Sequence, residues 1–141
     1  MDTLHYLLMK THTLLQRKII SEATKLGLSS GQPKILDCLS EYEGSDQKTI
    51  AEYCEIEQAT AGSILTGMEN TGLIVRKQKQ GNRRSLFIYL TDKGKTVSKD
   101  MKAVFDNADL QATSALSEQE LEQLKSLLNK ICISLKNESE G

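Results

Sequence analysis

The 141-residue sequence has no tryptophan, two phenylalanines and four tyrosines. It therefore lacks the flat side chains on which unpaired bases stack, and single-strand binding by stacking is not expected. The hydrophobic content of 38% and charged content of 26% indicate a globular chain. A chain of this length can bury a core in one domain without disulfides or metals.

Cysteine is also scarce. Cys38, Cys54 and Cys132 form no C-x-x-C pair, which argues against a disulfide framework or a thiolate zinc site. A reducing cytoplasm is the expected location. We expect all three thiols to be buried on apolar helical faces; the alternative is that Cys132, two residues after Lys130, crosslinks two chains on oxidation.

Long apolar runs and catalytic motifs are missing as well. The mostly apolar residues 4–8 give way to Lys10, so neither a signal peptide nor a membrane span is expected. The sequence has no Gly-rich phosphate loop and no recognisable Ser–His–acid set, so it does not predict an enzyme. His5 and His12 share a helical face but lie two turns apart, too far to hold one metal ion together. We expect no metal, cofactor or membrane partner.

Positive charge is concentrated between residues 73 and 95. This segment has seven Lys or Arg and one acid, a local charge of +6 in a chain of formal net charge −1, so the other residues together carry −7. One basic region on an otherwise acidic chain is the electrostatic pattern of a nucleic-acid-binding protein. The alternative is a solvated, charged hairpin.

Apolar spacing, one proline and a few glycines divide the chain into about six helices and a hairpin. Gly27 is a candidate left-handed helix cap, and Ser29 with Gln32 and Ser117 with Glu120 have the capping-box spacing. The predicted helices cover residues 2–26, Ser29 to near Gly44, Ser45 or Asp46 to Cys54, Glu57 to Asn70, Thr91 to beyond Ala108, and Ser117 to about Leu135.

Two short helices over 46–54 and 57–70, joined by a tight turn, predict a helix-turn-helix. Residues 72–90 then read as two strands joined by a basic turn, which is typical of a wing. The predicted fold is mainly α with a small β-hairpin wing, a winged helix-turn-helix with N- and C-terminal dimerisation helices. In the second short helix, Gly62 either lets backbone approach DNA or is merely tolerated.

The last predicted helix carries apolar residues at steps of three and four, a heptad pattern. This seam forms either a dimer interface with the first helix or a contact with the chain's own fifth helix. The candidate dimer residues are Leu4, Leu8, Leu15, Leu121, Leu124, Leu128, Ile131 and Leu135.

Two stretches together resemble the MarR family of winged helix-turn-helix transcriptional regulators. Residues 68–76, Met-Glu-Asn-Thr-Gly-Leu-Ile-Val-Arg, are similar to the exit of the family's recognition helix. Asn82-Arg83-Arg84 and then residues 90–94, Leu-Thr-Asp-Lys-Gly, are similar to its wing and fifth-helix start. The resemblance covers nearly the whole chain. It implies a homodimer on pseudo-palindromic double-stranded operator DNA, released by a small molecule, a metal ion or cysteine oxidation.

The resemblance also implies a domain plan and candidate sites. Residues 1–141 would form a single MarR-like domain, with 1–28 and 96–141 as dimerisation helices and 29–95 as the DNA-binding lobe. The DNA-binding candidates are Gln58, Ala59, Thr60, Gly62, Ser63, Lys77, Lys79, Asn82, Arg83 and Arg84, with Arg84 in the minor groove. The effector-binding candidates are Tyr6, His12, Tyr42 and Met101.

Two residues depart from the family pattern. Asn82 stands where the family commonly has an aspartate that holds the wing arginine, and an amide lacks the charge assistance of a carboxylate. Ser63 stands where a basic residue is common, so we expect less base readout from this helix and a larger contribution of phosphate contacts and DNA shape to binding. The leading hypothesis is a homodimeric, sequence-specific DNA-binding repressor released by a small molecule. The alternatives are a winged-helix module that binds an acidic protein, or a metal- or redox-gated regulator of the same fold.

Overall fold

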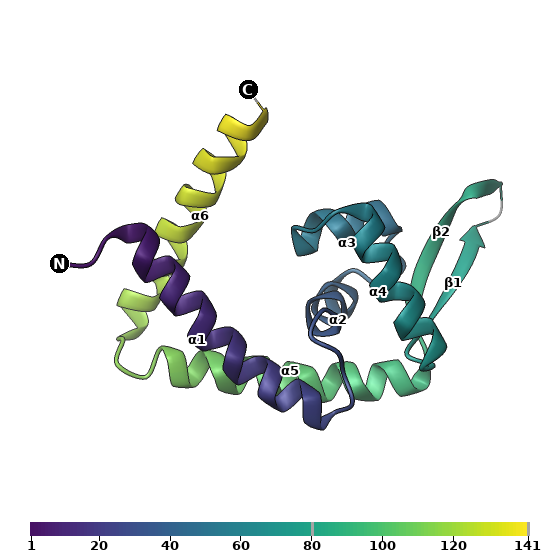
Figure 1. Ribbon diagram of the computed structural model, residues 1–141, viewed down its shortest axis with the longest axis horizontal. Coiled ribbons are helices and arrows are strands. Elements are labelled where there is room, and N and C mark those ends of the chain that lie inside the picture. Colours follow the sequence, from purple (N-terminus) through teal and green to yellow (C-terminus); the bar gives the residue numbers. More distant parts are fainter. Residues whose placement is uncertain (80, 141) are drawn as a thin grey trace. The chain divides into compact units, whose positions relative to one another are not determined.

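The computed structural model describes residues 1–79 and 81–140; at positions 79, 82–84 and 138–140 it describes the backbone only. The described chain is mainly helical with one antiparallel hairpin (Figure 1), as the sequence predicted. Its elements are α1 (Leu4–Lys25), α2 (Gln32–Glu41), α3 (Gln47–Cys54), α4 (Gln58–Asn70), β1 (Ile74–Lys79), β2 (Asn82–Leu90), α5 (Asp92–Ala112) and α6 (Glu118–Glu140). They divide into two compact units, Met1–Ala108 and Asp109–Gly141.

α1 ends in a Schellman motif. Gly27 adopts φ +81°, which is favourable only for a residue without a Cβ. Its N–H donates to the Thr24 carbonyl at 3.0 Å, and the Leu28 N–H donates to the Ala23 carbonyl at 3.1 Å. Ala23 and Leu28 are both buried, so the cap that the sequence predicted at Gly27 also starts the core.

The start of α2 corrects one sequence prediction. The helix begins at Gln32 with Gly31 as a cap that makes no side-chain hydrogen bond, so Ser29 is not the N-cap. Half of the expected capping box survives, because the Ser29 N–H donates to Gln32 Oε1 at 3.2 Å. Gly31 faces Ile64 of α4, whose Cδ1 would lie 2.8 Å from an added Cβ. The helix start is therefore set by packing against α4.

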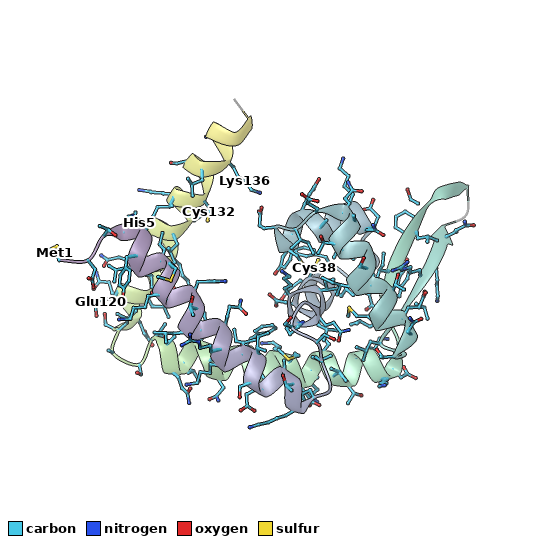
Figure 2. All side chains as sticks on the ribbon, in the orientation of Figure 1. Met1, His5, Cys38, Glu120, Cys132 and Lys136 are labelled. Carbon is cyan, nitrogen blue, oxygen red and sulfur yellow. The ribbon has the colours of Figure 1, made fainter. Side chains whose placement is uncertain are left out.

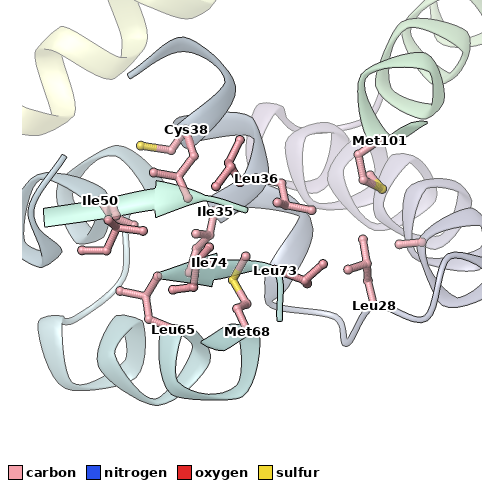
Figure 3. Close-up of a cluster of buried hydrophobic side chains, with 14 of the residues drawn as sticks. Leu28, Ile35, Leu36, Cys38, Ile50, Leu65, Met68, Leu73, Ile74 and Met101 are labelled. Carbon is pink, nitrogen blue, oxygen red and sulfur yellow. The ribbon is translucent and has the colours of Figure 1, made fainter. Parts of the chain in front are cut away.

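The core of the first unit lies where α2, α4 and the hairpin meet. Ile35 and Leu36 of α2, Leu65 and Met68 of α4, and Ile74 of β1 are each at most 1% exposed and point toward one another (Figure 3). Each buried aliphatic side chain of this size contributes about 1.5–3 kcal/mol. This cluster fixes α4 against the root of the hairpin.

The hairpin is anchored on both edges at its root. Ile74 pairs with Leu90 and Arg76 with Ile88, with an irregularity between Gln78 and Lys79. The loop after α2 forms an isolated β-bridge with β2, in which the Gly44 N–H donates to the Ile88 carbonyl at 2.8 Å and the Ile88 N–H donates to the Ser45 carbonyl at 2.9 Å. β2 therefore has partners on two sides near its C-terminal end.

The Leu-Thr-x-x-Gly stretch is explained by the junction between β2 and α5. The Thr91 hydroxyl accepts the Gly94 N–H at 3.0 Å and donates to the Gly72 carbonyl. Gly94 packs so closely on the Leu73 carbonyl oxygen that an added Cβ would overlap it. The threonine caps α5 and the glycine lets α5 begin directly against the start of β1.

The second unit contains the last turn of α5 and α6. Its capping box is complete, because the Glu120 N–H donates to Ser117 Oγ at 3.1 Å and the Ser117 N–H donates to Glu120 Oε1 at 2.9 Å. Leu121 and Ile131 of the heptad seam are half-buried, while Leu124, Leu128 and Leu135 are exposed. Across the described residues, none of the helices has the length and apolar content that a membrane span requires.

Gly94→Ala should destabilise the protein by about 1–3 kcal/mol, because the added methyl group overlaps a backbone oxygen that cannot move aside. Gly67→Ala in α4 is the matched control, since its Cβ would meet only Gln32 Nε2 at 3.7 Å. That change should leave stability equal or raise it by up to about 1 kcal/mol. Urea unfolding at one protein concentration measures both, and equal effects of the two substitutions would contradict this account of the motif.

Candidate nucleic-acid interface

α3 and α4 form a helix-turn-helix whose turn is set by local chemistry. Asp46 caps α3 by accepting the Thr49 N–H at 2.8 Å, and this bond lowers the pKa of the Asp46 carboxyl below its ordinary value of 3.8. Glu55 ends α3 in the left-handed conformation at φ +55°, and its N–H donates to the Glu52 carbonyl. α4 can then start at Gln58, after a turn of only three residues.

α4 has one buried side and one exposed side. Ala61, Leu65 and Met68, spaced by four and three residues, are buried. The outer face of the first two turns carries Gln58, Ala59, Thr60 and Ser63, all exposed. These four predicted DNA-binding residues therefore lie together on one surface of short, mostly polar side chains.

The fifth predicted residue of α4, Gly62, is half-buried and is accounted for by packing. A Cβ at Gly62 would lie 2.9 Å from Gln47 Nε2 of α3. The same Nε2 donates to the Gln58 carbonyl at 2.8 Å. The glycine therefore lets the first residue of α3 rest on the first turn of α4. Close internal packing accounts for Gly62, which is neither the approach to DNA nor the merely tolerated glycine considered from the sequence.

A cavity of about 280 Å³ lies between this helix pair and β2. It is lined by Asp46, Gln47, Lys48, Gln58, Ser85 and Leu86. Lys48 and Gln58 are exposed, so an ammonium group and an amide flank the opening. Donors of this kind suit an anionic oxygen such as that of a phosphate, with the Asp46 carboxylate engaged in capping α3.

The wing carries the other predicted contacts. Lys77 is exposed, and its Nζ lies 5.4 Å from the centroid of the Tyr89 ring, a distance at which the ammonium is attracted to the ring face. The side chains of Lys79, Asn82, Arg83 and Arg84 lie outside the described part of the chain. Their backbone belongs to β1 and β2, so they flank the turn between the strands as predicted.

The predicted effector residues are not gathered at one place. Met101 is 1% exposed in the core, Tyr42 makes an edge-to-face contact with Tyr53, and Tyr6 has Lys10 over its ring. His12 borders a cavity of about 300 Å³ between α1, α2 and α5. The lining residues of this second cavity are His12, Gln16, Ile19, Ile20, Ser30, Pro33, Lys34 and Phe105.

The cysteines have different environments. Cys38 is fully buried among α2–α4 (Figure 2), and burial together with the nearby Cys54 raises the pKa of its thiol to about 11. Burial also raises the pKa of Cys54, whose Sγ–H donates to the Lys34 carbonyl at 3.4 Å. Both thiols are held protonated and unreactive. Cys132 is exposed, so the prediction of three buried thiols was wrong there, because α6 does not bury its surface within its own unit.

The described residues contain no cluster of three or more His, Cys, Asp or Glu able to hold a metal ion. Sequence reasoning did not single out four residues that line or support this candidate interface: Gln47, Lys48, Arg76 and Ser85. Lys48 lies two residues after the α3 cap, which is the one local signal that was available. The others take part through long-range contacts that spacing does not reveal.

Comparison with known proteins agrees with this geometry. Residues 28–86 match the model of the MarR family. Over 128 residues, 91% of this chain and 92% of the relative, the sequence is 25% identical to the HTH-type transcriptional repressor Rv2887 of Mycobacterium tuberculosis. The crystal structure of the MepR–DNA complex of S. aureus is similar with a TM-score of 0.85 and 26% identity, covering 96% of this chain and 99% of that one. A structure of Rv2887 in complex with salicylic acid has a TM-score of 0.71 and 24% identity, covering 93% and 97% of the two chains.

Asp46→Ala should cost about 0.5–2 kcal/mol of unfolding free energy at neutral pH, because α3 loses its side-chain cap. The cap acts as a carboxylate, and its folded-state pKa lies below the ordinary 3.8. Its contribution is therefore complete above that value and disappears as the pH falls through the folded-state pKa. Urea unfolding of both proteins across this range checks the prediction. A stability difference independent of pH would show that the charge of Asp46 is irrelevant.

Proposed function

Because this chain belongs to the MarR family of transcriptional regulators, we propose that it binds double-stranded operator DNA as a homodimeric repressor and is released by a small-molecule effector. The named relatives are regulators rather than enzymes, and the proposal includes no catalysis. A regulator of this kind acts in the cytoplasm, where its DNA is. The single observation that carries the proposal is the exposed outer face of α4 beside a basic wing.

The DNA contacts divide into two kinds. The short side chains of Gln58, Thr60 and Ser63 are suited to the major groove, where glutamine pairs with adenine and hydroxyls accept either partner. The Lys48 ammonium and the helix N-termini beside it are suited to phosphate. The wing then brings Arg84 into the adjacent minor groove, where A·T-rich DNA concentrates negative potential.

The homodimer is supported by the apolar residues that the chain leaves uncovered. Leu4 and Leu8 of α1 are 60% and 39% exposed, and Leu135 of α6 is 63% exposed. Exposed leucines at helical spacing on one helix, such as Leu4 and Leu8, mark an interface with another chain. We assign the dimer interface to the predicted seams of α1 and α6, which leaves residues 29–95 as the DNA-binding lobe. A two-fold dimer matches a pseudo-palindromic operator.

The cavity between α1, α2 and α5 is our candidate effector site. Phe105, Pro33 and Ile19 supply an apolar surface, while Lys34 and His12 supply donors at its border. A volume of about 300 Å³ is at the small end of ligand sites and suits a single-ring compound. Salicylic acid, the ligand of the Rv2887 complex, has one apolar ring and one carboxylate that Lys34 can pair with.

Arg84→Ala should weaken operator binding by about 1–3 kcal/mol, because the wing loses its minor-groove contact.

Lys48→Ala should weaken binding to operator and scrambled duplexes alike. It should also lower the salt dependence of binding by about one phosphate contact per protomer. Lys102→Ala is the control, since Lys102 already pairs with Asp106 at 2.9 Å in α5. Fluorescence anisotropy titrations at fixed salt measure all three, and wild-type affinity of the Arg84 variant removes the wing from the proposal.

Salicylate should bind the protein and weaken its hold on DNA, whereas the neutral salicylamide should bind much less. Lys34→Met keeps the apolar stem and removes the charge, so it should abolish the preference for the acid over the amide. Isothermal titration calorimetry with both compounds provides the measurement. Equal binding of the acid to wild type and variant would place the effector elsewhere.

A further inference from the structure

We propose that Arg76 is a positioning residue that fastens α4 to the wing, so that both present their DNA-reading side chains as one rigid body. The inference rests on the proposed function for its consequence, but its structural content concerns the protein alone. Arg76 lies in β1 opposite Ile88, on the same strand face as the buried Ile74. Its side chain therefore extends toward α4.

The contact is a closed set of hydrogen bonds. Arg76 Nη2 donates to the Gly62 carbonyl at 3.0 Å and to Thr66 Oγ1 at 3.0 Å. The Thr66 hydroxyl in turn donates to the Gly62 carbonyl at 3.0 Å. One planar cation thus links two successive turns of α4 to the hairpin, and bonds from a charged donor are the stronger class.

The energetics argue that these bonds are the reason for an arginine here. Arg76 is half-buried, and its Nε is buried with no hydrogen-bond partner in the described part of the chain. A buried, unsatisfied donor costs free energy that an apolar side chain of similar length would not incur. Nε is shielded from solvent and Nη2 is engaged with α4, so these two nitrogens face the protein rather than a phosphate.

A second contact, from Gln47 of α3, holds the same turns of α4 from the other side. Gln47 of α3 rests on Gly62 and donates to the Gln58 carbonyl at 2.8 Å. The N-terminal half of α4 is therefore held from α3 on one side and from β1 on the other. That half presents Gln58, Thr60 and Ser63, so a small rotation of α4 would move every predicted base contact relative to the wing.

The hydrogen bonds from Arg76 to Gly62 and Thr66, called the clamp from here on, also bear on the wing tip, where Asn82 departs from the family pattern. Asn82 stands where the family commonly has an aspartate, and an amide cannot offer an arginine a charge-assisted hydrogen bond. A fixed root limits how far the tip can move even when the tip itself is held loosely. Arg76 and Thr66 therefore supply the alignment between wing and helix on which selective binding depends.

Three variants test the clamp. Arg76→Lys keeps the positive charge but loses the planar fork, Thr66→Val keeps the shape but loses the hydroxyl, and Thr96→Val is the matched control. Thr96 makes the same bond to its own helix, to the Asp92 carbonyl at 3.2 Å, and has no arginine partner among the described residues. Each protein is measured without DNA by hydrogen exchange of residues 58–66 and 74–78, after circular dichroism confirms folding.

The clamp predicts faster exchange in both segments for Arg76→Lys and Thr66→Val, with the Thr96 control unchanged. It also predicts about a tenfold fall in the ratio of affinities for the protein's own promoter duplex and a scrambled duplex, at unchanged salt dependence. The double variant Arg76→Lys with Thr66→Val should lose no more of this affinity ratio than either single variant, since both substitutions break the same contact.

Unchanged exchange in both variants overturns the clamp. Faster exchange with an unchanged affinity ratio overturns the positioning role, because Arg76 would then only stabilise the fold. Equal weakening on both duplexes by Arg76→Lys, with Thr66→Val binding like the wild type, also overturns it, in favour of a direct contact between Arg76 and a phosphate. A wild-type protein that prefers neither duplex contradicts the proposed function instead, and the exchange rates still decide whether Arg76 fastens α4.

Discussion

The burial of one stripe of α4 is the interaction on which the rest of the molecule depends. Ala61, Leu65 and Met68 each have no measurable exposure, and three buried side chains outweigh any contribution that the polar outer face makes to folding. The stripe fixes which side of α4 faces α2 and β1. It therefore decides that Gln58, Thr60 and Ser63 face outward, where they can meet another molecule.

The hydrogen bonds around α4 fix the rotation of this helix, which burial alone does not. Hydrophobic packing is not directional, so it holds α4 down but leaves small rotations inexpensive. The contacts from Gln47 and Arg76 are directional and end on backbone carbonyls of the same two turns. Gly62 is the meeting point of both, which explains why a residue of poor helix propensity is found inside α4.

Much of the fold could be predicted from the sequence because its signals are local. Gly27, Asp46, Thr91 and Ser117 set helix ends through contacts within a few residues, and the comparisons support the winged helix that these elements form. The prediction at Ser29 was wrong because a distant contact, Gly31 against Ile64, moved the helix start. Local capping chemistry does not include such contacts.

The candidate site was less accessible to sequence reasoning. The outward face of α4 followed from helical periodicity, but Arg76 looked like one more basic residue of the wing. Its partners lie 14 and 10 residues away on a different element, and only the fold brings them together. The second cavity likewise joins Phe105 to Pro33 and His12, which are far apart in the chain.

Charge explains how such a protein can read DNA with a sequence pI of about 6.1. The basic residues are concentrated at the wing, so a duplex is attracted there and repelled by the acidic remainder. The most direct test is binding of the purified protein to the DNA upstream of its own gene, compared with a scrambled duplex of equal length at two salt concentrations. The account predicts preferential binding that weakens steeply with salt, and equal, weak binding to both duplexes would contradict it.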